Sequence, residues 1–282
     1  MQPWLRLVRV GNTVTAFAGA VVGGLVARGS GLPTGSAFWV LVILAGISTA
    51  CVTAGGNVVN DVLDLATDRT NHPDRPLVTG AISAGTAKAA AVVLFVAGGL
   101  AMVPVALSAP LVAVLFGIAV VALLGYEFRF KSEGFAGNLL VAFLTGAVFL
   151  YGGAAVGDPL LVVPFATMAF GATLSREVIK DMEDAQGDLD RRTLPRVRGL
   201  GTASAVARVT VALAILLSPV PLLTFLAPTS AEGIMYLALV GAADALFVVS
   251  VVWLPKRLHR EQTLSKGAMT VALLAFLAAA FR

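Results

Sequence analysis

Acidic and amide side chains recur at helical spacing between residues 57 and 68. In an α-helix, residues separated by three, four or seven positions lie on one face. Four polar residues of this segment have that spacing, namely Asn57, Asn60, Asp61 and Asp64, and Asp68 follows four residues later. The pattern predicts that two amides and at least two carboxylates project from one helix face.

A second acidic segment repeats this pattern later in the chain. Its aspartates lie 120 residues after those of the first, so that Asp61, Asp64 and Asp68 correspond to Asp181, Asp184 and Asp188. Downstream of each segment a proline precedes a glycine by four residues, at Pro76 and Gly80 and at Pro195 and Gly199. These matches indicate an internal repeat.

Clustered carboxylates repel one another, and a bound cation is the most direct way to keep several of them ionised. The chain has one cysteine, Cys51, and two histidines, so oxygen ligands dominate and favour magnesium over zinc. We therefore expect a magnesium site whose central, catalytic acids are Asp61, Asp64, Asp181 and Asp184. The basic residues expected to bind phosphate oxygens beside it are Arg75, Arg129, Lys131, Arg176 and Lys180.

The rest of the chain indicates a polytopic membrane protein. Of its 282 residues, 58% are hydrophobic and 13% are charged, and the mean hydropathy is +0.90. Soluble domains have roughly 25% charged residues, so that class is excluded. Reading for about 20 mostly apolar residues predicts an all-α bundle of nine transmembrane helices. Their predicted bounds are Val10–Ala27, Ala37–Val59, Ala84–Val105, Ala109–Tyr126, Ala136–Val156, Leu160–Ile179, Ala203–Phe225, Ile234–Leu254 and Ala268–Phe281.

The distribution of charge predicts the orientation of these helices. The N-terminus and the loops after the second, fourth, sixth and eighth spans contain nearly all of the 20 Lys and Arg residues, with Arg28 and Arg282 as exceptions. Because basic loops stay inside, we expect the N-terminus and the acidic segments in the cytoplasm and the C-terminus outside. The second and sixth spans then run in the same direction, so the repeat is of the parallel kind. The net charge of +4 arises from these loops and does not indicate nucleic-acid binding.

A phosphate-binding metal site at the mouth of an apolar bundle predicts an amphiphilic substrate with a charged head and a long apolar tail. Prenyl diphosphates have this chemistry. Magnesium and cationic side chains would take up the charge of the departing diphosphate, and an acceptor nucleophile would capture the allylic carbocation. The apolar bundle would keep water away from that cation.

These residues resemble the UbiA superfamily of intramembrane prenyltransferases. The first motif of that family, NDxxDxxxD, is present from Asn60 to Asp68 and is followed by the proline-rich segment from Asn71 to Gly80. The second motif matches the segment from Lys180 to Asp188. The resemblance covers essentially the whole chain, so we expect 1–282 to form a single domain of the UbiA type.

The resemblance also implies roles for individual residues. The metal ligands that it implies are Asn57, Asp61, Asp64, Asp181, Asp184 and Asp188. In the loop after the fourth span it implies a diphosphate-binding lysine, for which we choose Lys131, with Arg129 as its rival. The residues expected to support the ligands or to contact the acceptor are Asn60, Asp68, Tyr126, Arg191 and Arg192.

Within this family, the segment from Arg176 to Asp184 resembles the archaeal branch that makes digeranylgeranylglyceryl phosphate. The resemblance implies a geranylgeranyl diphosphate donor, a geranylgeranylglyceryl phosphate acceptor and release of diphosphate at the cell membrane. Two alternatives stay open. One is an aromatic acceptor, as in quinone, chlorin or haem synthesis, and the other is secondary transport, for which the mid-span Asp244 would be the functional group. Nothing in the sequence indicates an oligomeric state.

Overall fold

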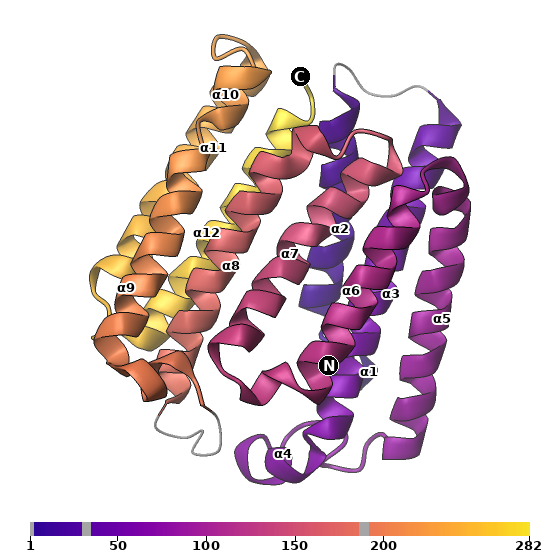
Figure 1. Ribbon diagram of the computed structural model, residues 1–282, viewed down its shortest axis with the longest axis vertical. Helices are drawn as coiled ribbons and strands as arrows, with labels where there is room; N and C mark the ends of the chain where they lie inside the picture. The colour runs from indigo at the N-terminus through magenta and orange to yellow at the C-terminus, as the bar shows by residue number, and fades with distance from the viewer. Residues whose placement is uncertain (1–2, 30–34, 186–191) are drawn as a thin grey trace.

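The computed structural model describes residues 3–29, 35–185 and 192–282. Within these ranges every regular element is a helix, and the long helices stand side by side in one bundle (Figure 1). The long helices are α2 (Val10–Arg28), α3 (Ser36–Leu63), α5 (Ala84–Ser108), α6 (Leu111–Phe128), α7 (Phe135–Ala155), α8 (Val163–Asp184), α9 (Leu194–Leu217), α11 (Ala231–Val252) and α12 (Leu258–Ala279). Short segments connect them, namely α1 (Pro3–Leu7), α4 (Leu65–Asn71), α10 (Val220–Thr224) and two 3₁₀ turns at Phe130–Ser132 and Leu160–Val162.

Nine helices in the described ranges are long and apolar enough to cross a membrane, which confirms the predicted number of spans. Several helix ends differ from the prediction, and four helices extend well beyond their predicted bounds at the end of the bundle that carries the acidic segments. Helix α8 continues to Asp184, past the predicted end at Ile179, and α9 begins at Leu194 rather than at Ala203. Helix α3 continues to Leu63, past the predicted end at Val59, and α12 begins at Leu258 rather than at Ala268. Hydropathy marks where an apolar stretch ends, whereas backbone hydrogen bonding carries a helix on into polar residues. These four extensions bring polar side chains to one end of the bundle.

Large apolar side chains on the outer faces of α5 and α6 are exposed, including Val92, Leu107 and Val121. A soluble protein rarely exposes so continuous an apolar surface. This distribution is expected for helices that contact lipid, where all backbone polar groups are satisfied within each helix.

Helix packing follows the internal repeat. Helices α2, α3, α5 and α6 of the first half correspond in order to α7, α8, α9 and α11 of the second. Helix α2 packs against α3 as α7 packs against α8, and α3 packs against α5 as α8 packs against α9. The paired glycines also match, since Gly80 and Gly199 both have a positive φ, of 75° and 82°. Helix α12 follows α11 as α7 follows α6, and it closes the bundle by packing against α8 and α2.

The two halves approach closely where α2 packs against α7. A methyl group added to Gly152 would overlap the carbonyl oxygen of Ala20, and one added to Gly23 would overlap the carbonyl oxygen of Phe149. Glycine at both positions lets the two backbones touch, as is common between membrane helices.

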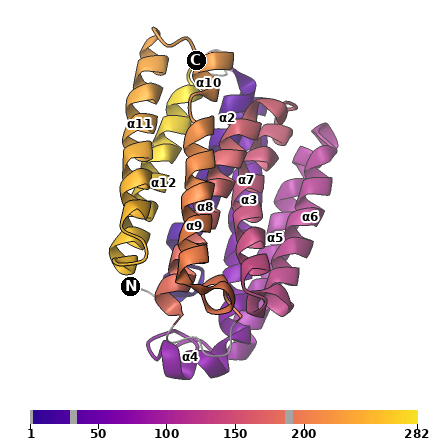
Figure 2. The same cartoon turned by 60° about the vertical axis from the view of Figure 1, so that its left-hand side comes forward.

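Both acidic segments lie at one end of the bundle. Helices α3 and α8 run in the same direction and end near α4, as the two views agree (Figures 1 and 2). The C-terminus lies at the opposite end (Figure 1). The fold therefore brings the two segments, far apart in sequence, to one face of the protein.

Candidate active site

A cavity of about 1270 Å³ lies between the two halves. Charged and amide side chains from the ends of α3, α4, α6, α8 and α12 line one part of it. Deeper turns of α2, α3, α6, α7, α8, α11 and α12 supply its largely apolar lining. The cavity therefore joins a charged rim to an apolar interior.

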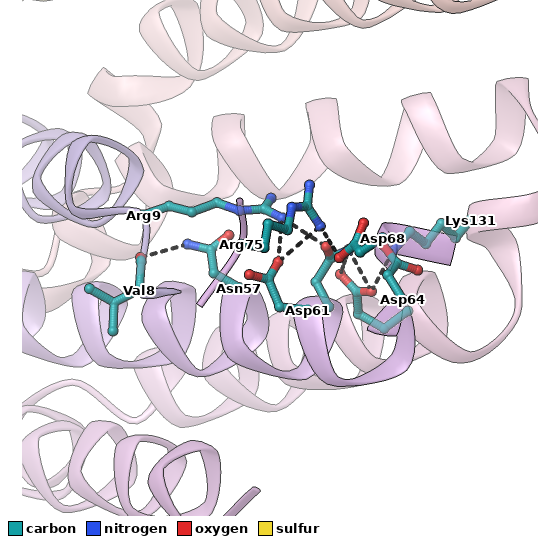
Figure 3. Close-up of polar contacts among 10 residues, drawn as sticks. Val8, Arg9, Asn57, Asp61, Asp64, Asp68, Arg75 and Lys131 are labelled. Atoms are coloured by element: carbon teal, nitrogen blue, oxygen red, sulfur yellow. Dashed lines mark hydrogen bonds and ion pairs between the residues drawn. The ribbon is translucent and has the colours of Figure 1, made fainter. Parts of the chain in front are cut away.

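Asp61 is buried beneath two arginines (Figure 3). Its side chain is only 4% exposed. Arg9 Nη2 lies 2.9 Å and Arg75 Nη1 lies 3.3 Å from its Oδ1 atom. Arg9 also donates to the amide oxygen of Asn60 at 2.8 Å. The two guanidinium groups offset the cost of taking this carboxylate out of water.

Arg9 reaches Asp61 because the chain breaks between α1 and α2. Its backbone lies in the left-handed region, with φ 49° and ψ 65°, which residues other than glycine seldom adopt. The same turn exposes the carbonyl oxygen of Val8, which accepts a hydrogen bond from Asn57 Nδ2 at 3.0 Å (Figure 3). Backbone outliers of this kind concentrate at functional sites. Here the outlier fixes the N-terminal segment on the first acidic segment.

Asp64 terminates α3 and faces Lys131 in the turn after α6. Lys131 Nζ lies 2.5 Å from Asp64 Oδ2 and 3.4 Å from Glu127 Oε2. Asn60 Nδ2 donates to the same Glu127 oxygen at 2.9 Å. Lys131 therefore joins α3 to α6 at the charged rim.

Asp68 lies on α4, the short helix after this break. Arg75 Nη1 is 2.5 Å from Asp68 Oδ2, so Arg75 bridges Asp68 and Asp61. Each aspartate of the first acidic segment thus has a cationic partner.

The second acidic segment has an amide partner as well as cations. Asp181 is 8% exposed, and its Oδ2 accepts a hydrogen bond from Asn138 Nδ2 at 2.7 Å. Glu177 is flanked by Arg176 at 2.7 Å and Lys180 at 3.6 Å.

One turn further along α8, Glu183 and Asp184 both line the cavity. Glu183 Oε1 lies 2.9 Å from His259 Nδ1 on α12. Helix α12 therefore completes the rim on this side. The predicted ninth span was shorter and began at Ala268, so it would not have reached the rim.

Most of the predicted site residues meet at this cavity. Those that line it are Asn57, Asn60, Asp64, Asp68, Arg75, Tyr126, Lys131, Arg176, Lys180 and Asp184. Asp61 and Asp181 are buried beside this lining. Arg129 lies away from it, because its side chain is 75% exposed and pairs with Glu133 at 3.8 Å. Arg192 is exposed before the start of α9, and Asp188 and Arg191 lie outside the described residues.

The described residues contain no group of three or more Asp, Glu, His or Cys side chains placed to hold a metal by themselves. The donor atoms at the rim are nevertheless carboxylate and amide oxygens, the set that suits magnesium. Magnesium needs only one or two protein carboxylates when substrate phosphates supply other ligands. The residues therefore fit a magnesium–diphosphate complex rather than a metal held by the protein alone.

Several residues of the site were not singled out from the sequence, among them Arg9, Glu127 and Asn138. Arg9 precedes the first span, and nothing in its surroundings predicts the turn that directs it toward α3. Glu127 stands four residues before Lys131 and could have been found as a helical ion pair. Asn138 is an isolated amide in an apolar span, a type of residue that is costly in a membrane unless it is paired.

Asp244 also lines the cavity, in its deeper part. Its Oδ2 accepts a hydrogen bond from Ser218 Oγ at 2.7 Å, across the contact between α9 and α11. The carboxylate is therefore partnered within the helix interface.

Comparison with known proteins identifies the family. The sequence pattern of the UbiA prenyltransferase family matches residues 15–279. A digeranylgeranylglyceryl phosphate synthase of Natronomonas pharaonis is 42% identical over 223 residues, which cover 78% of this chain and 77% of that protein. A synthase of the same name from Methanopyrus kandleri is 36% identical over 285 residues, which cover 99% of both chains.

Solved structures have the same fold. A structure of digeranylgeranylglyceryl phosphate synthase is 30% identical with a TM-score of 0.77, covering 99% of this chain and 98% of that chain. A UbiA homologue from Archaeoglobus fulgidus, bound to GPP and Mg²⁺, is 17% identical with a TM-score of 0.71 over 99% of this chain and 98% of that chain. The chain therefore belongs to the UbiA prenyltransferase family, and it is a membrane-embedded prenyltransferase.

Proposed function

We propose that this protein transfers the geranylgeranyl group of geranylgeranyl diphosphate to the free hydroxyl of geranylgeranylglyceryl phosphate. The observation that carries the proposal is the continuous cavity from the charged rim to the apolar interior. Such a cavity suits a donor with a charged head and a long apolar tail. The names of the similar archaeal synthases support this choice of donor and acceptor.

The rim residues would hold a divalent cation together with the diphosphate. We assign this role to Asn57, Asp61 and Asp64 from the first acidic segment and to Asp181, Asp184 and Asp188 from the second. Magnesium, when bound, supplies positive charge that stabilises the departing diphosphate. The Archaeoglobus fulgidus homologue that binds Mg²⁺ with GPP supports this choice of metal.

The cations of the rim would bind the phosphate oxygens. Lys131 and Arg75 now pair with Asp64, Asp61 and Asp68. Arg176 and Lys180 flank Glu177 on the opposite side of the cavity. Charge-assisted hydrogen bonds from these groups would orient the donor and stabilise the negative charge that grows on its leaving group.

The bond changes then balance without a redox partner. The C1–O bond of the donor breaks, and the acceptor oxygen forms an ether bond to C1. The hydroxyl proton passes to solvent, and diphosphate is released. The apolar helices around the deeper cavity would exclude water, which would otherwise capture the allylic cation.

We further propose that the chain is a single domain that lies in the cell membrane with its N-terminus and both acidic segments on the cytoplasmic side and its C-terminus outside. The concentration of Lys and Arg at the end of the bundle that carries the cavity rim supports this orientation. Secondary transport, the alternative centred on Asp244, gains no support, because Asp244 is hydrogen bonded in a helix interface.

The test uses purified protein in detergent, radiolabelled geranylgeranyl diphosphate and magnesium. Geranylgeranylglyceryl phosphate and 4-hydroxybenzoate are offered in separate reactions, each with an EDTA control. We expect a metal-dependent product only from the glyceryl phosphate. A product only from the aromatic acceptor would overturn the proposed substrate, and no product from either would overturn the proposed transfer.

A further inference from the structure

A buried hydrogen bond lies at the deep end of the cavity, far from the charged rim. Tyr151 on α7 donates its hydroxyl to Ser48 Oγ on α3 at 3.0 Å. Tyr151 is 4% exposed and Ser48 is fully buried, yet both side chains line the cavity. The pair therefore joins two walls of the cavity at this depth.

The cavity follows one face of α3 from the rim down to this pair. The residues of α3 that line it are Ser48, Thr49, Val52, Thr53, Gly56, Asn57, Asn60 and Asp64. They form two adjacent rows with a spacing of four residues, from 48 to 64 and from 49 to 57, so they lie on one face of the helix. No residue of α3 before Ser48 belongs to the lining, although this helix is described from Ser36 onward.

Dense packing closes the cavity beyond Tyr151. Tyr151 belongs to an apolar cluster at the outer ends of α3, α5, α6 and α7. The other buried members of this cluster are Ala45, Val105, Val112, Ala154 and Ala155. Ala45, one turn beyond Ser48 on α3, is fully buried. A chain that descends from the rim along α3 would therefore stop at the ring of Tyr151.

The depth of this stop matches one prenyl chain length. Ser48 lies 13 residues before Asp61 on the same helix, which is about 20 Å at the helical rise. A geranylgeranyl chain has four isoprene units of four bonds each. With C–C bonds of about 1.5 Å in zigzag geometry, it extends to on the order of 20 Å. One further isoprene unit would reach into the closed cluster.

We propose that Tyr151 and Ser48 form the floor of the donor-tail channel and set the longest donor chain that the enzyme accepts. This inference rests on the proposed prenyl transfer and assigns the wall formed by α3, α6 and α7 to the donor. Leu115 and Phe116 of α6 line the same cavity and pack against the Tyr151 cluster, so the floor is bounded on three sides.

The test compares farnesyl, geranylgeranyl and geranylfarnesyl diphosphates as donors with one acceptor. We expect the wild-type protein to favour the geranylgeranyl donor and Tyr151→Ala to raise relative use of geranylfarnesyl diphosphate by at least about tenfold. Tyr151→Phe keeps the ring and is expected to keep the wild-type preference. Tyr151→Leu, which keeps apolar packing, is the second variant if Tyr151→Ala does not fold.

Leu150→Ala is the matched control. Leu150 is the adjacent residue on α7 but packs against another apolar cluster and does not line the cavity. We expect it to keep the wild-type ratio of donor use. Suppose that the wild-type protein transfers prenyl groups and that folded Tyr151→Ala or Tyr151→Leu keeps the wild-type ratio of donor use. The floor assignment is then overturned, and the proposed function stands. If the wild-type protein transfers no prenyl group from any donor, the proposed function is overturned and the floor assignment with it.

Discussion

The two acidic segments correspond in sequence but differ in what surrounds them. Asp61 in the first contacts two arginines, at 2.9 and 3.3 Å. Asp181, its counterpart 120 residues later, accepts a hydrogen bond from the neutral amide of Asn138 at 2.7 Å. The repeated helix carries an aspartate at the same position in both halves. Residues outside the repeated motif determine which side chains contact that aspartate.

The basic residues beside the two acidic segments are arranged differently in the two halves. The position 120 residues after Lys131 is Val251, whereas the positions 120 residues before Arg176 and Lys180 are Gly56 and Asn60. Arg9 corresponds to Arg129, but Arg129 is largely exposed and pairs with Glu133. The repeat therefore supplies two acidic rims, whereas the basic residues beside them do not follow the repeat. Arg9, Arg75 and Lys131 contact aspartates of the first segment, and Arg176 and Lys180 contact Glu177 of the second. We infer that both rims contribute cations to the phosphate groups of the donor.

The largest effect should come from removing the corresponding acids. Asp61→Ala and Asp181→Ala should each lower turnover by at least about 1,000-fold, because each removes a group that holds the metal and its diphosphate. The variants are measured by product formation, with size-exclusion chromatography in detergent as the control for folding. Turnover near the wild-type level in either folded variant would show that only one rim is needed.

Substitutions of the two basic residues in the turn after α6 should have smaller effects on donor binding, and the two effects should differ. Lys131→Ala should raise the donor KM by about 10- to 100-fold, because one charge-assisted contact to diphosphate is lost. Arg129→Ala is the matched control and should behave like the wild-type protein, since Arg129 lies away from the cavity. The opposite result, with the effect in Arg129→Ala, would reverse our choice between them.

A substitution of Arg9 tests whether the turn between α1 and α2 contributes to the difference between the two acidic segments. Arg9→Ala leaves the buried Asp61 with one guanidinium partner instead of two, and we expect kcat/KM for the donor to fall about tenfold. Arg6→Ala is a suitable control, because Arg6 pairs with Asp74 at the exposed surface. Equal kinetics in the two variants would mean that Arg9 only positions the N-terminal segment.

The smallest effect should come from Asn138, the neutral partner of the second half. Asn138→Ala removes one hydrogen bond to Asp181 and should lower kcat by about two- to tenfold. Thr167→Val, on α8, is a control that loses only a hydrogen bond to the backbone of its own helix, and Thr167 does not line the cavity. A loss in Asn138→Ala as large as that in Asp181→Ala would show that the amide does more than orient the carboxylate.

Much of this architecture could be predicted from local patterns. Apolar stretches gave the number of spans, and the spacing of Asp61 and Asp64 placed them together because helix periodicity is local. The partners of these acids could not be predicted in the same way. Arg9 lies 52 residues from Asp61, and Asn138 lies 43 residues from Asp181, so each contact depends on how helices pack. The choice of Lys131 over Arg129 likewise depends on which way a short turn after α6 directs two neighbouring side chains.

The floor of the cavity could be predicted even less. Ser48 and Tyr151 are 103 residues apart, and each is an uncharged hydroxyl side chain in an apolar span. Neither residue has a motif around it. Their pairing depends on the contact between α3 and α7, which no periodicity in the sequence reveals.

The central claim is that both acidic segments act on the same magnesium–diphosphate complex. The most direct test is a double-mutant cycle on magnesium-dependent binding of labelled geranylgeranyl diphosphate, using Asp64→Asn, Asp184→Asn and the double variant. Groups that share one ligand show strong coupling in such a cycle. The account predicts that the double variant binds the donor little worse than either single variant. Losses that multiply, as expected for two independent sites, would contradict it.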